Sequence, residues 1–245
     1  MILKISAALG VSLVLSLIIP TSVTAQTYEE GVLSCLLEPS QDIRVGIPAD
    51  GVLTSIKVDR SDRVRQGQLL AELDTRLERA GINIQEARKE FAARRLERAK
   101  NLQAAQLIPE QELDELVTEQ RLSELELIER REQIRLKQTF SPIDGVVVEK
   151  YASTGDLVQK NELLRIMQLD PLYVEVVLSL DWFGKIQTGE QKNVLLQHLD
   201  DTVEATVINV DAVIDPASST FRVRLSLPNP DYRIPSGLRC QFVDP

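Results

Sequence analysis

The heptapeptide "IPADGVL" at residues 47–53 returns as "SPIDGVV" at residues 141–147, and this near-repeat decides the fold. The correspondence continues without a gap at a constant offset of 94 residues. It includes Pro48 and Pro142, Asp50 and Asp144, Gly51 and Gly145, Val52 and Val146, Asp62 and Asp156, Val64 and Val158, Leu69 and Leu163, and Leu70 and Leu164. In each copy a D-G turn leads into a strand, a polar turn and a second short strand.

Neither copy is long enough to enclose a core by itself. The pattern therefore predicts that the two copies pair face to face in one flattened β-sandwich, which we expect to comprise residues 45–74 plus 139–170. The glycines expected in its turns are Gly51, Gly67, Gly145 and Gly155.

The segment between the copies changes character to helix-forming Glu, Arg, Ala, Leu and Gln. We predict helices over 75–105 and 110–137, with Pro109 in the first turn of the second helix. Because the break between them is very short, the two helices must run antiparallel, as a hairpin over 75–138 about 45 Å long. A stripe at spacings of three and four is expected to be its packing face: Leu77, Ala80, Ile84, Ala87 and Phe91, with a weaker continuation through Leu96, Ala99 and Leu102. The hairpin is either a solvated spacer or a projection whose tip contacts another molecule.

The remaining sequence is rich in short β-like runs. Residues 31–74 contain several of them, broken by turn signals, and residues 26–44 are expected to supply N-terminal strands that join a C-terminal domain. Residues 171–245 predict that domain to be a small antiparallel β-barrel. The fold class is therefore mainly β, with a long α-helical hairpin inserted into a split sandwich and a barrel after it.

The N-terminus predicts export. Residues 1–25 combine an early Lys4, an apolar run and small residues before Gln26, as a cleaved signal peptide does. The alternative is an uncleaved anchor, but the apolar run is shorter than the ~20 residues of a membrane span. In an oxidising compartment Cys35 and Cys240 form either a disulfide or a pair of buried small apolar residues.

Several function classes are disfavoured by composition and motifs. The net charge of −9 argues against nucleic acid as a partner. The lone His198, the lack of a Cys/His cluster and the absence of P-loop or nucleophile motifs predict no metal site, no cofactor and no enzyme activity.

The half-motif "ADGVLTSIKVDRSDRVRQGQLLAELD" and its echo "SPIDGVVVEKYASTGDLVQKNELLRI" resemble the split biotinyl-lipoyl domain of periplasmic adaptor subunits, the membrane fusion proteins of the HlyD family. The stretch "VDAVIDPASSTFRVRLSLPNPDYRIPSGLRCQFV" is similar to the barrel motifs of that family, including its L-P-N-P pattern. The resemblance covers nearly all of residues 31–245 and joins three motifs in the same order.

This resemblance implies a periplasmic adaptor of a tripartite efflux system. Its expected partners are an inner-membrane transporter, RND-type before ABC, an outer-membrane channel and further copies of itself in a ring, with a hexamer expected. Pump-type members dock through a tip pattern of Arg, three residues, Leu, six residues and Ser. Arg98 and Leu102 fit this pattern, whereas Pro109 replaces the Ser; the alternative is that Arg98 and Leu102 are ordinary helix residues.

Two further expectations concern the ends of the chain and rival functions. A membrane-proximal domain is expected to be at most a remnant built from 26–44. Cys35 and Cys240 lie near the two chain ends, which are expected to meet beside the barrel, and this favours a disulfide between them. A carrier or ligand-binding module on the lipoyl fold is a rival function, although the hairpin occupies the turn where a carrier presents its modified Lys. An envelope scaffold that docks no channel is a second rival.

Overall fold

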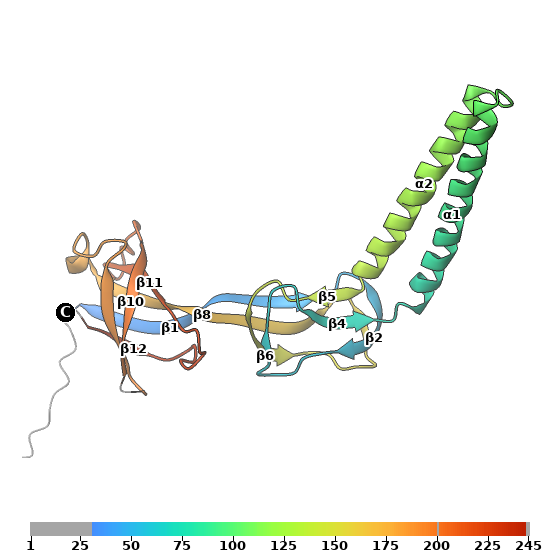
Figure 1. Ribbon diagram of the computed structural model, residues 1–245. Helices are drawn as coiled ribbons and strands as arrows, with labels where there is room; N and C mark the ends of the chain where they lie inside the picture. Colours follow the sequence, from blue (N-terminus) through green and yellow to red (C-terminus); the bar gives the residue numbers. More distant parts are fainter. Residues whose placement is uncertain (1–30, 200, 244–245) are drawn as a thin grey trace, which may run out of the picture.

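The computed structural model describes residues 31–199 and 201–243. The predicted signal segment 1–25 and the first residues of the expected N-terminal strands, 26–30, lie outside these residues. The described part is mainly β with two long helices, as expected. Figure 1 shows an elongated molecule in which a helical hairpin and a C-terminal β unit lie at opposite ends of a central β unit.

The two copies of the repeat form two sheets with equivalent strand orders, β5-β4-β2-β7 and β1-β8-β6-β3. Each copy lends its short middle strand to the other, because β2 pairs with β7 and β6 pairs with β3. The bounds of these strands are β1 Val32–Gly46, β2 Asp50–Ile56, β3 Arg63–Val64, β4 Leu69–Leu73, β5 Gln138–Phe140, β6 Gly145–Lys150, β7 Leu157–Gln159 and β8 Glu162–Ser179. We call this part, residues 42–74 and 138–168, the repeat unit.

One core joins both copies in the repeat unit. Fully buried side chains come from the first copy, such as Leu53 and Leu70, and from the second copy, such as Val147 and Leu163. This shared core is why neither copy needs to enclose apolar residues alone.

The C-terminal unit comprises residues 171–243 with the first part of β1. Its further elements are η1 Leu180–Trp182, β9 Gln191–Leu196, β10 Asp201–Val210, β11 Thr220–Leu227 and β12 Cys240–Val243. Antiparallel pairing runs in the order β12-β9-β10-β11-β8, and β1 pairs with β8. Backbone hydrogen bonds join Leu37 to Gly237 and Leu238, so the segment just before β12 is bonded to β1. Alternating side chains such as Val174, Val176 and Val223 fill its core.

The runs "VLSCLL" and "IRVGI" were expected as separate short strands, but they belong to the single 15-residue strand β1. β1 pairs with β8 along almost its whole length, with an irregularity between Pro39 and Gln41. The two strands run through both expected domain borders, at 44/45 and 170/171, so the two β units have separate cores but share a continuous ribbon (Figure 1).

The expected glycine turns divide into two kinds. Gly67 and Gly155 lie in turns with φ of 78° and 99°, in the left-handed region that favours glycine. Gly51 and Gly145 lie in strands rather than in turns, within β2 and at the start of β6. A Cβ atom at Gly145 would lie 2.4 Å from the carbonyl oxygen of Met167, so the close approach of β6 to β8 requires glycine there.

Candidate docking and assembly surfaces

The hairpin consists of α1, Arg76–Ala104, and α2, Glu110–Arg135, close to the predicted ranges. Its packing face agrees with the expected one only toward the tip, where Leu96 and Ala99 are buried. The residues that α1 buries against α2 are Gln85, Ala92, Leu96 and Ala99. Gln85 and Ala92 lie one residue after Ile84 and Phe91 of the expected stripe. Because neighbouring helix positions are about 100° apart, that part of the stripe turns away from α2.

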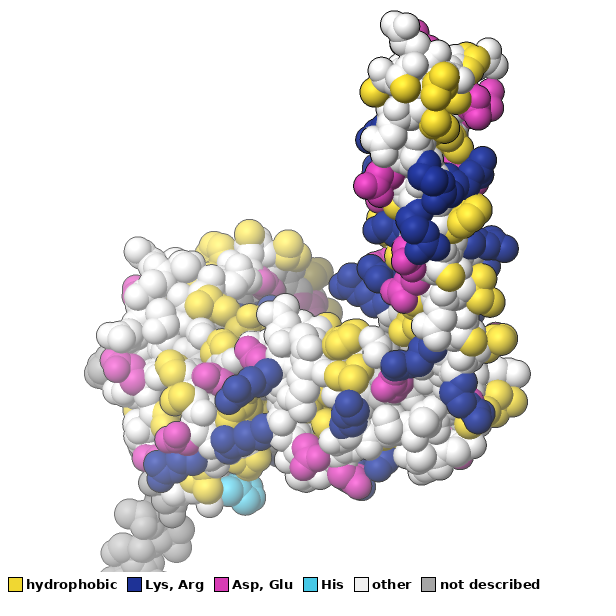
Figure 2. All heavy atoms as spheres, turned by 45° about the vertical axis from the view of Figure 1, so that its right-hand side comes forward, with side chains coloured by type: hydrophobic (Ala, Val, Ile, Leu, Met, Phe, Trp, Pro, Cys, Tyr) yellow, Lys and Arg dark blue, Asp and Glu magenta, His cyan; other side chains and the backbone are white. Residues whose placement is uncertain are grey.

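This part of the stripe is therefore exposed. Leu77 and Phe91 are 81% and 51% accessible, and Ile84 lies between them at the same seven-residue step. Next to Phe91, a groove of about 830 Å³ runs between the helices and includes Leu122 and Glu119 of α2. Figure 2 shows apolar patches alternating with basic side chains along the hairpin.

The two helices have opposite charge. α1 carries eight Lys or Arg against four Glu, whereas α2 carries nine Asp or Glu against four Arg. Ion pairs such as Arg95 with Glu119 at 2.6 Å and Arg131 with Glu86 at 3.0 Å use part of this charge within the hairpin. Their side chains are half exposed, so each pair stabilises the hairpin by at most ~1 kcal/mol.

The tip is a tight turn between the helices with an exposed apolar residue. Ile108 folds inward onto the cluster of Leu96, Ala99 and Leu116, and thereby holds the turn. The backbone N–H of Leu107 donates to the carbonyl of Leu102 at 2.9 Å, while the side chain of Leu107 is 70% exposed.

The three residues matched to the family tip pattern all lie near this turn. Arg98 and Leu102 lie one helical turn apart and are exposed, and Pro109 is the N-cap of α2 with φ −65° and ψ 152°. Leu107 is not among the residues predicted from the sequence, and the signal that could have found it is a large apolar residue in a turn too short to bury it.

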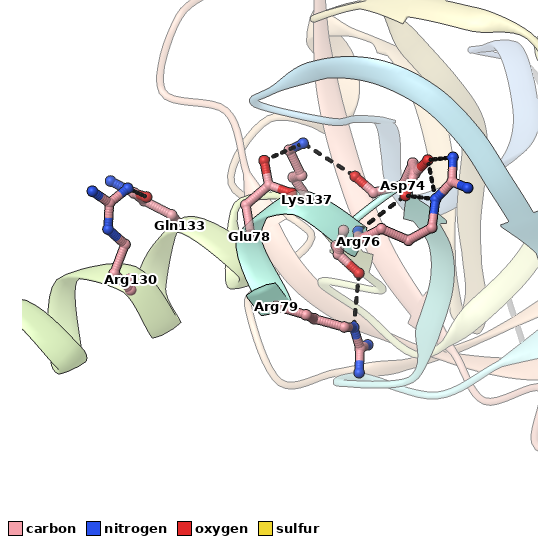
Figure 3. Close-up of polar contacts among 8 residues, drawn as sticks. Asp74, Arg76, Glu78, Arg79, Arg130, Gln133 and Lys137 are labelled. Atoms are coloured by element: carbon pink, nitrogen blue, oxygen red, sulfur yellow. Dashed lines mark hydrogen bonds and ion pairs between the residues drawn. The ribbon is translucent and has the colours of Figure 1, made fainter. Parts of the chain in front are cut away.

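The root of the hairpin is tied to the repeat unit by a polar network (Figure 3). Lys137, just after α2, donates to Glu78 of α1 at 2.6 Å and to the backbone carbonyl of Asp74 at 3.1 Å. The Asp74 carboxylate accepts from the guanidinium and the backbone N–H of Arg76, and the latter bond satisfies a free donor at the helix start. The network joins Asp74, two residues before α1, to Lys137, two residues after α2.

The root favours ionised carboxylates. The hydrogen bond from Lys137 holds the pKa of Glu78 below its ordinary value, against the opposing effect of burial. The guanidinium of Arg76 lowers the pKa of Asp74 to about 2. Both groups therefore stay charged in neutral and mildly acidic solution, and the network persists there.

The cysteine pair lies at the seam between the first and last strands. Cys35 of β1 and Cys240 of β12 form a disulfide, with Cα atoms 5.0 Å apart, and both residues are buried. The disulfide closes a sequence separation of 205 residues and lies beside the bridge between Leu36 and Arg239.

Residues 31–199 and 201–243 contain two α-helices, α1 and α2. Neither helix there is long and apolar enough to cross a bilayer. In the same residues no group of three or more His, Cys, Asp or Glu side chains is arranged to hold a metal ion.

Comparison with known proteins places this architecture in a class. The family described as RND MFP, barrel-sandwich hybrid domain, matches residues 41–176, more than half of the chain. The chain therefore belongs to the RND membrane fusion proteins that carry a barrel-sandwich hybrid domain.

The particular relatives are distant. The solvent efflux pump periplasmic linker SrpA of Pseudomonas putida is 24% identical over 205 residues, which cover 77% of this chain and 54% of SrpA. The cobalt-zinc-cadmium resistance protein CzcB of Cupriavidus metallidurans is 25% identical over 206 residues, covering 77% of this chain and 39% of CzcB. The chain thus spans about half the length of the efflux linkers it matches, or less.

Solved structures share the fold. The MacA-MexA chimeric protein that contains the Pseudomonas aeruginosa MexA α-hairpin domain superposes with a TM-score of 0.71 at 20% identity, covering 88% of this chain and 87% of the chimera. The membrane fusion protein Spr0693 of Streptococcus pneumoniae R6 gives a TM-score of 0.69 at 16% identity, covering 87% and 98%.

Proposed function

We propose that this protein is an exported periplasmic adaptor that links an inner-membrane transporter, RND-type before ABC, to an outer-membrane channel. The observation that carries the proposal is the projecting hairpin, whose exposed tip lies at the opposite end of the molecule from the C-terminal unit (Figure 1). The names of relatives such as SrpA, an efflux pump periplasmic linker, support it. In this proposal residues 1–25 direct export to the periplasm. The mature protein is associated with the inner membrane because it binds the transporter there.

The tip is the proposed channel contact. Arg98 and Leu102 would present a basic and an apolar group on one face of α1, and Leu107 would add an apolar group at the end. Pro109 starts α2 without a hydroxyl, so the contact would depend on apolar burial more than on a hydrogen bond from this position.

Rings of this chain, with a hexamer expected, are the proposed working assembly. The exposed stripe of Leu77, Ile84 and Phe91 needs a covering surface, and a neighbouring hairpin would supply one. Side by side, the basic α1 of one copy would face the acidic α2 of the next, which favours a head-to-tail ring over other arrangements.

The role is mechanical in this proposal. The repeat unit would be a split biotinyl-lipoyl-like sandwich and the C-terminal unit a small β-barrel, stacked as rings below the hairpin tube. The turn that carries the modified Lys in a true carrier is replaced here by the hairpin. We therefore propose no bound cofactor and no catalytic activity.

A complementation assay tests the proposal in a host that lacks its own adaptor. Leu107→Asp places a charge at the exposed tip and should abolish protection against the exported compound. The matched control is Leu157→Asp on the repeat unit, which is comparably exposed at 67% and should retain protection. Removal of residues 96–115 should also abolish protection, whereas unchanged susceptibility would favour an envelope scaffold that docks no channel.

Two solution measurements separate the remaining alternatives. Phe91→Glu should lower the oligomer mass in sedimentation velocity, and added salt should lower it for the unchanged protein because the facing charges are solvent-accessible. Intact-mass measurement of the mature protein should show the mass of the unmodified chain, and a covalent group on any Lys would favour the carrier function instead.

A further inference from the structure

The L-P-N-P motif begins at Leu227, the last residue of β11, and continues into the loop "PNPDYRIPSG" at residues 228–237, and the adaptor function assigns it no role. The loop begins where the C-terminal unit meets the repeat unit, because Leu227 pairs with Leu172 of β8. At this junction the ladder between β1 and β8 is irregular at Pro39 and Gln41. A two-stranded ribbon with such a break is expected to bend there unless a third connection holds it.

Asn229 anchors this loop to the ribbon. It is only 3% exposed, and its side-chain amide donates to the carbonyls of Leu169 at 3.0 Å and Ile234 at 2.9 Å. Its side-chain oxygen accepts from the backbone N–H of Ile234 at 3.1 Å, and its own backbone N–H donates to the Asp170 carboxylate at 2.8 Å. The buried amide thus fixes both the loop's shape and its seat on β8.

The anchored loop reaches across to the repeat unit. Arg63 of β3 donates to the backbone carbonyl of Asp231 at 2.8 Å, and its guanidinium lies 4.5 Å from the centroid of the Tyr232 ring. Tyr232 has φ of 56°, an uncommon conformation for a bulky residue, which directs the chain at this contact. A cation over an aromatic face and a charge-assisted hydrogen bond therefore join the two β units.

We propose that Asn229, Tyr232 and Arg63 form a brace that fixes the orientation of the C-terminal unit relative to the repeat unit. Without the brace, the units pivot about the ribbon at residues 39–41 and 169–171. Asn229 is a positioning residue, because it acts by holding Tyr232 and Asp231 against Arg63. This inference concerns one chain and does not depend on a ring, a channel or a transporter.

Distance measurement between the units tests the brace. Nitroxide labels are attached at two exposed strand positions, Thr54 of β2 and Glu204 of β10. They are attached through a genetically encoded keto amino acid and not through cysteine, so that the disulfide between Cys35 and Cys240 stays intact. Pulsed electron paramagnetic resonance on the full chain should give one narrow distance distribution. The double variant Arg63→Ala/Tyr232→Asn should at least double its width, since Asn tolerates the left-handed backbone but lacks the ring.

Matched variants separate the brace from general stability. Arg60→Ala removes an exposed Arg from the segment just before β3 and should leave the distribution unchanged. Tyr232→Phe keeps the ring and should also retain the narrow distribution. Asn229→Asp loses both amide donors and should broaden it like the double variant.

The test does not depend on Asn229→Asp, which removes buried hydrogen bonds and can therefore lower the melting temperature. Arg63 and Tyr232 lie at the surface, so their double variant should keep the melting temperature of the unchanged protein. A narrow distribution in that variant would overturn the brace, and so would equal broadening by Arg60→Ala.

Discussion

The two β units and the hairpin use their apolar residues in opposite ways. The β units enclose clusters of seventeen and fifteen buried apolar residues, whereas the cluster inside the hairpin has three. The helices meet through small or polar residues such as Ala92 and Ser123 as well as through leucines such as Leu127, while Phe91 and Leu77 face outward. The β units therefore bury most of their large apolar side chains, and the hairpin leaves several of its own exposed.

A pair of phenylalanines tests this contrast most strongly. Phe221 is 2% exposed and packs edge-to-face with Phe183, so Phe221→Ala should lower the free energy of unfolding by about 3–5 kcal/mol. Phe91→Ala should change it by less than about 0.5 kcal/mol, because the ring is half exposed. Urea unfolding of both variants under conditions that keep the chain monomeric gives the comparison.

The same two variants should reverse their order in assembly. Phe91→Ala should reduce the oligomer fraction in sedimentation velocity, while folded Phe221→Ala should not. Equal destabilisation by the two substitutions would mean that the hairpin stripe is buried within one chain in solution, against the exposure described above.

The disulfide offers a second way to separate the regions. Replacing both Cys35 and Cys240 by Ala should cost the C-terminal unit about 2–4 kcal/mol, because the bond joins strands far apart in sequence. Trp182 lies 6.1 Å from Phe242 of β12, so its fluorescence reports unfolding of this unit. Circular dichroism at 222 nm, dominated by α1 and α2, should follow an unchanged hairpin transition. A loss confined to the helical signal would contradict the separation.

Replacing glycine by alanine at two positions should change the stability in opposite directions. Gly145→Ala forces a methyl group against the Met167 carbonyl and should destabilise the repeat unit by about 1–3 kcal/mol. Gly81→Ala in α1 meets no atom within 4 Å and should stabilise the hairpin by about 0.5–1 kcal/mol. Thermal melting of both variants checks the signs, and a destabilising Gly81→Ala would show that the helix closely approaches another surface.

The sequence predicted the architecture well where a pattern repeats. The constant offset between the copies predicted one split unit, and the helix ranges agreed within two residues because Pro109 and the helix-forming composition mark the ends. The family resemblance was confirmed by the match over residues 41–176. Long β1 was predicted as short strands because its apolar runs are separated by the polar stretch around Pro39, and pairing with β8 continues through that stretch.

The surfaces were harder to predict. Two interleaved sets at seven-residue spacing run along α1, and the larger apolar set, Leu77, Ile84 and Phe91, is the natural choice for the packed face. The helices instead meet there through Gln85 and Ala92, whereas Leu96 and Ala99, at the weaker end of the expected stripe, are buried as predicted. Asn229 and Lys137 act through partners far along the chain, and no local pattern shows that their partners converge. The roles of Arg98, Leu102 and Pro109 remain predictions.

The last expected effect concerns the root, where the hairpin meets the repeat unit. Lys137→Met keeps the length of the side chain but removes the cation that bonds Glu78, and should destabilise the hairpin by about 1 kcal/mol at pH 7. The folded-state pKa of Glu78 lies below its unfolded value near 4.5, so this contribution is complete above that value and disappears as pH falls through the lower folded pKa. The stability difference between the unchanged protein and Lys137→Met, measured at 222 nm, should therefore be constant from pH 7 to about 6 and shrink below 4.5.

Glu78→Gln completes this test, because the amide cannot ionise. Its own stability should depend less on pH between 5 and 3 than that of the unchanged protein, and adding Lys137→Met to it should cost little. A loss on Lys137→Met that is independent of pH would instead assign the effect to the hydrogen bond from Lys137 to the Asp74 carbonyl, which has no titrating acceptor. The two outcomes distinguish two ways of holding the hairpin to the repeat unit, an ion pair between Lys137 and Glu78 or a hydrogen bond from Lys137 to the Asp74 carbonyl. Only a hairpin held by the ion pair would loosen in acid before the β cores unfold.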